Sequence, residues 1–239
     1  MIDENLVSIV DKKYFNGPNR ILVSDFAISL FQNSEIVKFK QDRLSFSNGV
    51  IISLKNAKQW ESNVPKISPD IVNTSIISNY LKNYLFVKPS VVEQFKFAVE
   101  TQNKKLVNYN VDKLVGLGSG LTPAGDDFLA GFISASWFLS EGGIKGIQPV
   151  KFFLKNVKIN YSKTNFISAA YLRYSIVGRI SEVIANTIIS ITERNPCMSF
   201  WLDNLANTGA TSGKDTLFGI LTAMEIHNAC KYSEKKLLS

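Results

Sequence analysis

The sequence predicts an α+β protein, with a small antiparallel β-rich part over residues 1–65 and a larger all-helical part over residues 66–239. Three observations support this prediction. Apolar residues alternate in short runs before Pro65, which is typical of strands. After Pro69 they recur about once per helical turn over long stretches. Strand and helix patterns do not alternate along the chain, so a doubly wound parallel sheet is disfavoured.

The β-rich part contains two apolar segments, Ile21–Phe31 and Glu35–Leu54. Within the second, Asn48-Gly49 separates Ser-Phe-Ser from Val-Ile-Ile. Both turn residues tolerate a positive φ, so this dipeptide predicts a hairpin. Gly17-Pro18 marks an earlier turn. We expect these segments to form a small antiparallel sheet or a partial barrel.

Proline and glycine divide the helical part, because they favour the starts and ends of helices. We expect Gly142-Gly143 to end one helix and Gly178 to interrupt another. The predicted helices cover residues 68–86, 89–105, 123–140, 148–158, 165–192, 196–207 and 214–232.

Composition excludes several classes of protein. The net charge is +7, but the lysines are scattered without interleaved aromatic residues, which favours solvated surface lysines over a nucleic-acid interface. No apolar run reaches the ~18 residues of a membrane span, and no secretory signal begins the sequence. The two cysteines, Cys197 and Cys230, lack metal-ligand spacing. We expect a cytoplasmic protein without a metal or cofactor.

The most informative segment is the glycine-rich loop GLGSGLTPAGDDFLAG, residues 116–131. Dense glycine before a helix lets the backbone turn sharply and leaves its N–H groups accessible. Thr122 is a candidate N-cap, and Pro123 suits the first helical position. Because the start of a helix carries partial positive charge, we expect the loop to bind phosphate or carboxylate.

Asp126 and Asp127 fall in the first turn of this predicted helix. They either offset the helix dipole and cap loop N–H groups, or they orient an amide or ammonium group of a ligand or hold a cation. Adjacent side chains on a helix point about 100° apart. We therefore expect one carboxylate to bind the ligand and the other to brace the loop.

Two phosphate-binding motifs do not fit. The dinucleotide fingerprint requires a third glycine where this chain has Leu121. The phosphate loop of nucleotide hydrolases requires G-x-x-x-x-G-K-[ST], whereas Gly209–Asp215 is one residue short and ends in aspartate.

The second glycine loop resembles the first. Residues 125–135 and 213–223 align without gaps, and Gly, Asp, Leu, Gly and Ala coincide. A threonine precedes each block, Thr122 and Thr211, offset by one residue. The alternative is two unrelated capped helices, but the coincidences favour two equivalent units, related by a local pseudo-twofold, whose helix starts converge on one cavity.

Other polar residues are candidates for the same cavity. Lys214 replaces the first aspartate in the second unit and either serves an anion, pairs with Asp126 or Asp127, or is solvated. Thr164 and Ser168 share a helical face. They either line a polar cavity or bond back to their own helix.

The loop of residues 116–131 resembles the signature of a bacterial family whose best-known members are AllH-type subunits of oxamate carbamoyltransferase. The resemblance extends to NGPNRI at residues 16–21, to residues 164–182 and to GATSGKDTLFGIL at residues 209–221. It implies the conversion of oxalurate and phosphate to oxamate and carbamoyl phosphate in allantoin breakdown. It also implies FdrA-like and AllG-like partner subunits.

These arguments lead to a candidate site that takes a small anion such as carbamoyl phosphate, phosphate or oxamate. The expected catalytic residues are Asp126, Asp127, Lys214 and Asp215. The expected substrate-binding residues are Gly116, Gly118, Ser119, Gly120, Thr122, Gly125, Thr164, Ser168, Thr211, Ser212 and Gly213. Two alternatives stay open: a non-catalytic assembly or metabolite-binding subunit, and a stand-alone hydrolase or lyase acting on a carboxylated amide.

Overall fold

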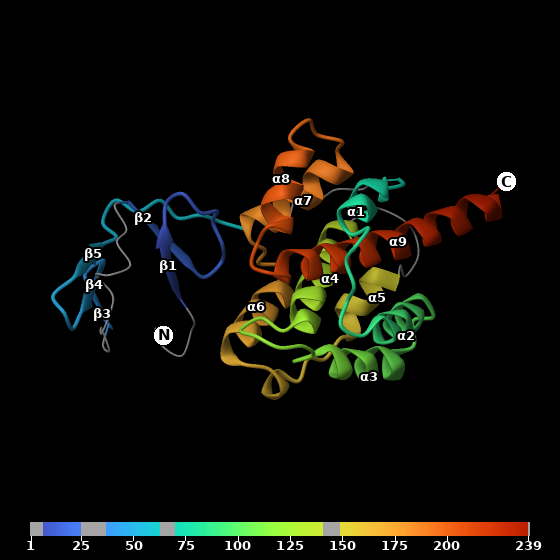
Figure 1. The fold of residues 1–239 in the computed structure, drawn as a ribbon, viewed down its shortest axis with the longest axis horizontal. Coiled ribbons are helices and arrows are strands. Elements are labelled where there is room, and N and C mark those ends of the chain that lie inside the picture. The colour runs from blue at the N-terminus through green and yellow to red at the C-terminus, as the bar shows by residue number, and fades with distance from the viewer. Residues whose placement is uncertain (1–6, 25–36, 63–69, 141–148, 239) are drawn as a thin grey trace. The chain divides into compact units, whose positions relative to one another are not determined.

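The computed structural model describes residues 7–24, 37–62, 70–140 and 149–238. The chain divides into two compact units, Met1–Ser62 and Asn63–Ser239. The first unit contains the strands and the second contains the helices (Figure 1). The predicted α+β class is confirmed.

An antiparallel sheet forms part of the first unit. Its strands are β3 (Val37–Lys40), β4 (Arg43–Phe46) and β5 (Ile51–Ser53), in that order. Gly49 has a φ of 85° and makes the predicted hairpin turn between β4 and β5. Its N–H donates to the carbonyl oxygen of Phe46 at 3.0 Å.

The other two strands, β1 (Ser8–Asp11) and β2 (Arg20–Val23), pair in parallel, so the antiparallel prediction is wrong for this pair. Alternating apolar residues predict a strand but carry no information about its direction. Arg20 holds the connection between the strands, because its Nη1 donates to the carbonyl oxygen of Phe15 at 2.9 Å. From residue 25 onward, the predicted segment Ile21–Phe31 lies outside the described residues.

The second unit is helical throughout its regular structure, as far as it is described. Its elements are α1 (Ser75–Tyr80), α2 (Pro89–Glu100), α3 (Lys104–Leu114), α4 (Ala124–Ser140), α5 (Pro149–Asn156), the 3₁₀ turn η2 (Tyr161–Lys163), α6 (Phe166–Ile176), α7 (Glu182–Thr192), α8 (Met198–Ala206) and α9 (Ser212–Leu238). The predicted break at Gly178 is confirmed, since this residue has a φ of 74° between α6 and α7. Gly142-Gly143 lies outside the described residues.

Two predicted helices are too long, and the helix predicted over residues 214–232 is too short, because α9 continues to Leu238. The helix expected over residues 68–86 is reduced to α1, because a side chain of α9 holds the backbone before it: Val72 N–H donates to Asn228 Oδ1, and Asn228 Nδ2 donates to Val72 O. The helix expected over residues 89–105 ends at Glu100. Gln102 then adopts a φ of 52°, and the Asn103 side chain caps α3.

Helix α4 forms the centre of the core. Phe128 and Phe132 on α4 are fully buried, together with Phe95 from α2 and Phe153 from α5. The rings of Phe95 and Phe153 each meet Phe132 edge to face, with centroids 4.8 Å apart. Such aromatic contacts bury a large apolar area and fix the orientation of α4. The start of α4, which carries the first glycine loop, is therefore held in place by the core.

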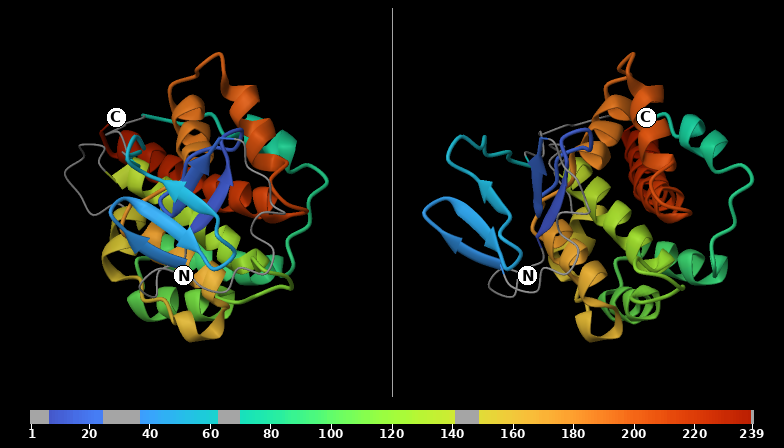
Figure 2. Two further views of the ribbon diagram at one scale, coloured as in Figure 1. Left: turned by 90° about the vertical axis from the view of Figure 1, so that its left-hand side faces the viewer. Right: turned by 60° about the vertical axis from the view of Figure 1, so that its left-hand side comes forward.

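Helices α4 and α9 cross at two glycines and lie against each other in each view of Figure 2. A Cβ at Gly131 would overlap the carbonyl oxygen of Thr216, and a Cβ at Gly219 would overlap that of Phe128. The gapless alignment pairs Gly131 with Gly219 and Phe128 with Thr216. The two contacts are thus equivalent, as a local twofold axis between the helices requires.

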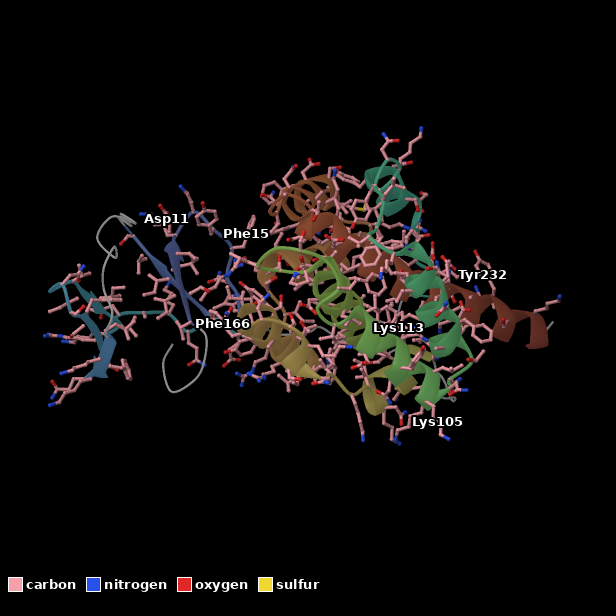
Figure 3. The ribbon with its side chains drawn as sticks, turned by 60° about the horizontal axis from the view of Figure 1, so that its bottom comes forward. Asp11, Phe15, Lys105, Lys113, Phe166 and Tyr232 are labelled. Carbon is pink, nitrogen blue, oxygen red and sulfur yellow. The ribbon has the colours of Figure 1, made fainter. Side chains whose placement is uncertain are left out.

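The long basic side chains of α3 lie on the surface of this unit. Lys105 and Lys113 are both exposed and extend away from the helical core (Figure 3). The Lys113 Nζ lies 4.2 Å from the ring centroid of Tyr109. Part of the positive charge of the chain is therefore spread over a solvated helix surface.

Candidate functional site

The first loop, residues 115–123, joins α3 to α4. Gly116, Gly118 and Gly120 adopt φ values of 73°, 112° and 98°, which side-chain-bearing residues rarely adopt. A Cβ at Gly116 would also overlap the carbonyl oxygen of Lys163. The glycines therefore let the loop fold tightly beside η2.

Asp126 braces this loop. The N–H of Gly116 donates to Asp126 Oδ1 at 2.9 Å, and the hydroxyl of Thr164 donates to Asp126 Oδ2. The carboxylate is only 3% exposed. Both of its oxygens are thus occupied by the loop and by the segment before α6. This is the bracing role that was expected of one aspartate in the pair.

The second loop, residues 207–211, joins α8 to α9 in a similar way. Gly209 has a φ of 62°. Gly213 lies so close to the carbonyl oxygen of Leu205, near the end of α8, that a Cβ would overlap it. Gly125 has the same relationship to the carbonyl oxygen of Leu114, at the end of α3. Each of the two repeated segments is therefore a helix, a glycine loop and a second helix that packs back onto the first.

The two loops meet at a pair of hydroxyl groups. The Oγ1 of Thr122 and the Oγ of Ser212 lie 2.7 Å apart and share a hydrogen bond. Both side chains are half-buried. The starts of α4 and α9 therefore converge, as the repeated sequence predicted.

Asp127 and Asp215 occupy equivalent positions at these helix starts. Asp215 is completely buried, whereas Asp127 is half-buried. Burial raises the pKa of Asp127 to about 7, hydrogen bonds from Ser212 and Thr122 oppose part of this rise, and the charge of Asp215 adds to it. The buried Oδ2 atoms of both carboxylates have no hydrogen-bond partner among the described residues.

Tyr84, between α1 and α2, contacts the acidic pair formed by Asp127 and Asp215. Its hydroxyl donates to Asp215 Oδ1. Burial raises the pKa of Asp215, and the hydrogen bonds from Tyr84 and Thr211 lower it. Burial and the contact with Asp215 raise the pKa of Tyr84 far above its usual range, so this hydroxyl is a permanent donor.

Some peptide N–H groups in the first turns of α4 and α9 have acceptors, although these groups were expected to be free to bind an anion. The N–H groups of Asp126 and Asp127 donate to the carbonyl oxygen of Pro123, and that of Asp215 donates to Thr211. These bonds close the first turns. At these two helix starts, the described N–H groups without an acceptor are those of residues 118–122, Ala124, residues 209–212 and Lys214.

Residues 114–224 match the family model of the oxamate carbamoyltransferase subunit AllH. This segment (the AllH segment) is similar to that family, and it makes up less than half of the 239 residues. It runs from the end of α3 into α9 and contains both glycine loops and the candidate aspartates Asp126, Asp127 and Asp215. The resemblance noted at residues 16–21 lies outside the match. No solved structure matches the chain.

The AllH segment uses Thr164 and Ser168 to support the first loop. Thr164 bonds Asp126, and the Ser168 hydroxyl donates to the carbonyl oxygen of Leu121 at 3.4 Å. Asn165 donates to the same carbonyl at 2.9 Å and also caps α6. Thr164 thus contacts the start of α4 and Ser168 contacts the first loop, and neither side chain bonds back to its own helix in these contacts.

The remaining predicted site residues of the AllH segment lie near the surface of the loops. Lys214 is half-buried in the first turn of α9 and forms no ion pair with Asp126 or Asp127. Exposed positions include Gly118, Ser119, Gly120 and Thr211. The loops that precede α4 and α9 therefore expose several of the predicted binding residues to solvent.

Sequence reasoning missed Tyr84 as part of the site. It lies outside the AllH match, and its apolar spacing suggested only a helix face. No motif connects a tyrosine at this position to an aspartate 131 residues later. The indirect signal was Asp215 itself, because a buried carboxylate requires a hydrogen-bond donor.

The described residues form neither a metal-binding cluster nor a membrane-spanning helix. No three His, Cys, Asp or Glu side chains gather in a geometry that could hold a metal ion, as far as the structure describes the chain. None of the described helices is long and apolar enough to cross a membrane.

Proposed function

We propose that this chain is a subunit of an oxamate-type carbamoyltransferase and that it binds a small anionic substrate at the loops preceding α4 and α9. The hydrogen bond between Thr122 and Ser212 carries the proposal, because it brings the two loops to one place. Phosphate, carbamoyl phosphate, oxamate and related acids are the ligands that fit.

The reaction implied by the family converts oxalurate and phosphate to oxamate and carbamoyl phosphate. A phosphate oxygen attacks the carbamoyl carbon, a tetrahedral oxyanion forms, and the bond to the oxamate nitrogen breaks. Fixed N–H donors stabilise such an oxyanion, and removing one typically costs ~2.7–4 kcal/mol of transition-state stabilisation. The unbonded N–H groups at residues 118–122 and 209–212 are the candidates for this role.

The convergence of two units also favours catalysis by positioning. Holding two reactants together supplies several kcal/mol without a covalent intermediate. Asp127 adds a group that can exchange a proton near neutral pH, because its pKa is about 7. This proton exchange suits a reaction in which the attacking phosphate loses a proton and the leaving nitrogen gains one.

Partner subunits of FdrA-like and AllG-like type complete the proposed enzyme, which acts in cytoplasmic allantoin breakdown. Two apolar side chains beside the first loop favour such assembly. Leu121 is 73% exposed and Phe166, labelled on α6 in Figure 3, is 61% exposed. They lie close together, because Asn165, the neighbour of Phe166, bonds the carbonyl of Leu121. This contact also supports the alternative of a non-catalytic assembly subunit.

Phosphorolysis of oxalurate tests the proposal. The purified chain is assayed alone and with the two partner subunits, and carbamoyl phosphate is measured. Product in the complete mixture, and a large loss of it with Thr122→Val, is expected. If the partners alone form carbamoyl phosphate at the same rate, the chain is an assembly subunit. If no mixture forms it, the proposed activity is wrong.

A further inference from the structure

The acidic pair formed by Asp127 and Asp215 is poorly suited to an anion. Asp215 is completely buried, the Oδ2 atom of Asp127 is buried as well, and the charge of each carboxylate opposes a second negative charge nearby. An anionic group is better placed at the N–H groups of the loops. The pair must therefore meet a different part of the ligand.

Two oxygen atoms define what the pair can bind. Tyr84 occupies Asp215 Oδ1, but Oδ2 of Asp215 and Oδ2 of Asp127 are buried without a donor among the described residues. A buried carboxylate oxygen without a donor costs free energy, so such atoms are rare unless they serve a ligand. Asp215 is 0% exposed, which makes the cost largest there.

We infer that Asp127 Oδ2 and Asp215 Oδ2 accept the two N–H bonds of a primary amide or carbamoyl group on the ligand. This assignment rests on the proposed function and specifies how the substrate is recognised. Equivalent positions on two helices related by a local twofold suit a planar –CO–NH₂ group, whose two N–H bonds diverge. The loop N–H groups then take the carboxylate or phosphate at the other end.

A divalent cation is the competing occupant of two carboxylate oxygens. Cation sites in proteins draw on more oxygen ligands than two, usually six or more counting water. Here Asp126, the nearest further carboxylate in sequence, has both of its oxygens occupied by Gly116 and Thr164. Donor atoms on the ligand therefore satisfy the pair better than a metal ion.

Oxamate and oxalate provide a direct test. They have nearly the same size, but in oxamate an amide replaces one of the two carboxylates of oxalate. Binding of each to the full chain is measured by calorimetry. Oxamate is expected to bind at least about tenfold more tightly, since hydrogen bonds to charged groups are strong. Equal affinity, tighter oxalate binding, or no binding of either would overturn the inference.

Variants test the assignment to these two residues. Asp127→Asn and Asp215→Asn each replace an acceptor oxygen and remove a charge, so the ratio of oxalate to oxamate affinity is expected to rise about tenfold or more. Asp70→Asn is the matched control: it changes the same atoms at an exposed carboxylate paired with Lys235 and is expected to leave the ratio unchanged. Mg²⁺ binding that disappears in Asp127→Asn would overturn the inference.

The outcome is separable from that of the proposed function. Carbamoyl phosphate production by the complete assembly, without a preference for oxamate in binding, would remove only the amide assignment. A clear oxamate preference that depends on Asp127, without any transfer activity, would support the amide assignment. The chain would then be a metabolite-binding subunit rather than part of the proposed enzyme.

Discussion

The hydroxyl oxygens of Thr122 and Ser212 lie 2.7 Å apart, although 90 positions separate the two residues in the sequence. This hydrogen bond joins two glycine loops that have similar sequences and precede two crossed helices. It shows that the two repeated segments meet at their helix starts.

A double-mutant cycle measures this contact. Thr122→Val and Ser212→Ala each remove one hydroxyl, and a coupling free energy of about 0.5–1.5 kcal/mol is expected from urea unfolding. Pairing Thr122→Val with Ser78→Ala on α1 is the control and should be additive, because Ser78 bonds its own helix at Thr74. Additivity of the first pair as well would mean that the loops do not touch in solution.

Asp126 and Asp127 are expected to differ in their effects on stability. Asp126→Ala leaves the donors at Gly116 and Thr164 without their acceptor, so the free energy of unfolding should fall by about 1–3 kcal/mol. Asp127→Asn should leave the thermal midpoint nearly unchanged or raise it above neutral pH, because it replaces a carboxylate that is costly to bury. Thermal unfolding followed by circular dichroism compares the two. Equal losses in both variants would assign Asp127 to loop architecture.

The raised pKa of Asp127 predicts a pH dependence of stability. Its pKa is about 7 in the folded protein against 3.8 for the free side chain, so between these values the folded state holds more protons than the unfolded state. The contribution of Asp127 to the free energy of unfolding therefore falls as pH rises through this range and then levels off. The thermal midpoint should be higher at about pH 5 than at about pH 8 as far as this group determines it.

Asp127→Asn checks the assignment, because it should reduce this difference in midpoint. Part of the difference in midpoint should remain in this variant, because the pKa of Asp215 is also raised. Asp70→Asn is the control: the hydrogen bond from Lys235 lowers the pKa of Asp70 from its usual 3.8, so this carboxylate stays ionised between pH 5 and pH 8 and its replacement should leave the difference unchanged. An unchanged difference in Asp127→Asn would show that Asp127 ionises normally.

The crossing of α4 and α9 predicts an unusual response to alanine. In an open helix interior, Gly→Ala stabilises by about 0.5–1 kcal/mol. Gly131→Ala should instead destabilise by about 1–3 kcal/mol or more, because the new methyl group overlaps the carbonyl of Thr216. Gly219→Ala, the equivalent change on α9, should cost a similar amount. Urea unfolding of the two variants measures both, and a gain in stability for either would contradict the close approach.

Much of the fold could be predicted from local patterns. The spacing of apolar residues indicated most helices, and Asn48-Gly49 indicated the hairpin, because both signals act within a few residues. The break between α2 and α3 was missed because Gln102 adopts a positive φ that its side chain does not encode. The parallel pairing of β1 and β2 was missed because direction depends on the connection between the strands.

Parts of the candidate site could also be predicted from the sequence. The two glycine loops and their aspartates were found from a repeat, and their convergence followed from that symmetry. Helix geometry predicted that one of Asp126 and Asp127 braces the loop, but which of the two does so depended on where Gly116 and Thr164 lie. Tyr84 could not be predicted, because its contact with Asp215 arises from tertiary packing alone.

The first glycine loop, residues 115–123, is longer than the second, residues 207–211. Two identical halves would accept a rod-like molecule equally well in either orientation, and half of the bound molecules would point the wrong way. Unequal loops remove that degeneracy, so a ligand with different ends has a single preferred direction. In the proposed site, the repeated sequence would supply two similar helix starts, and the difference in loop length would make the two ends of the site distinguishable.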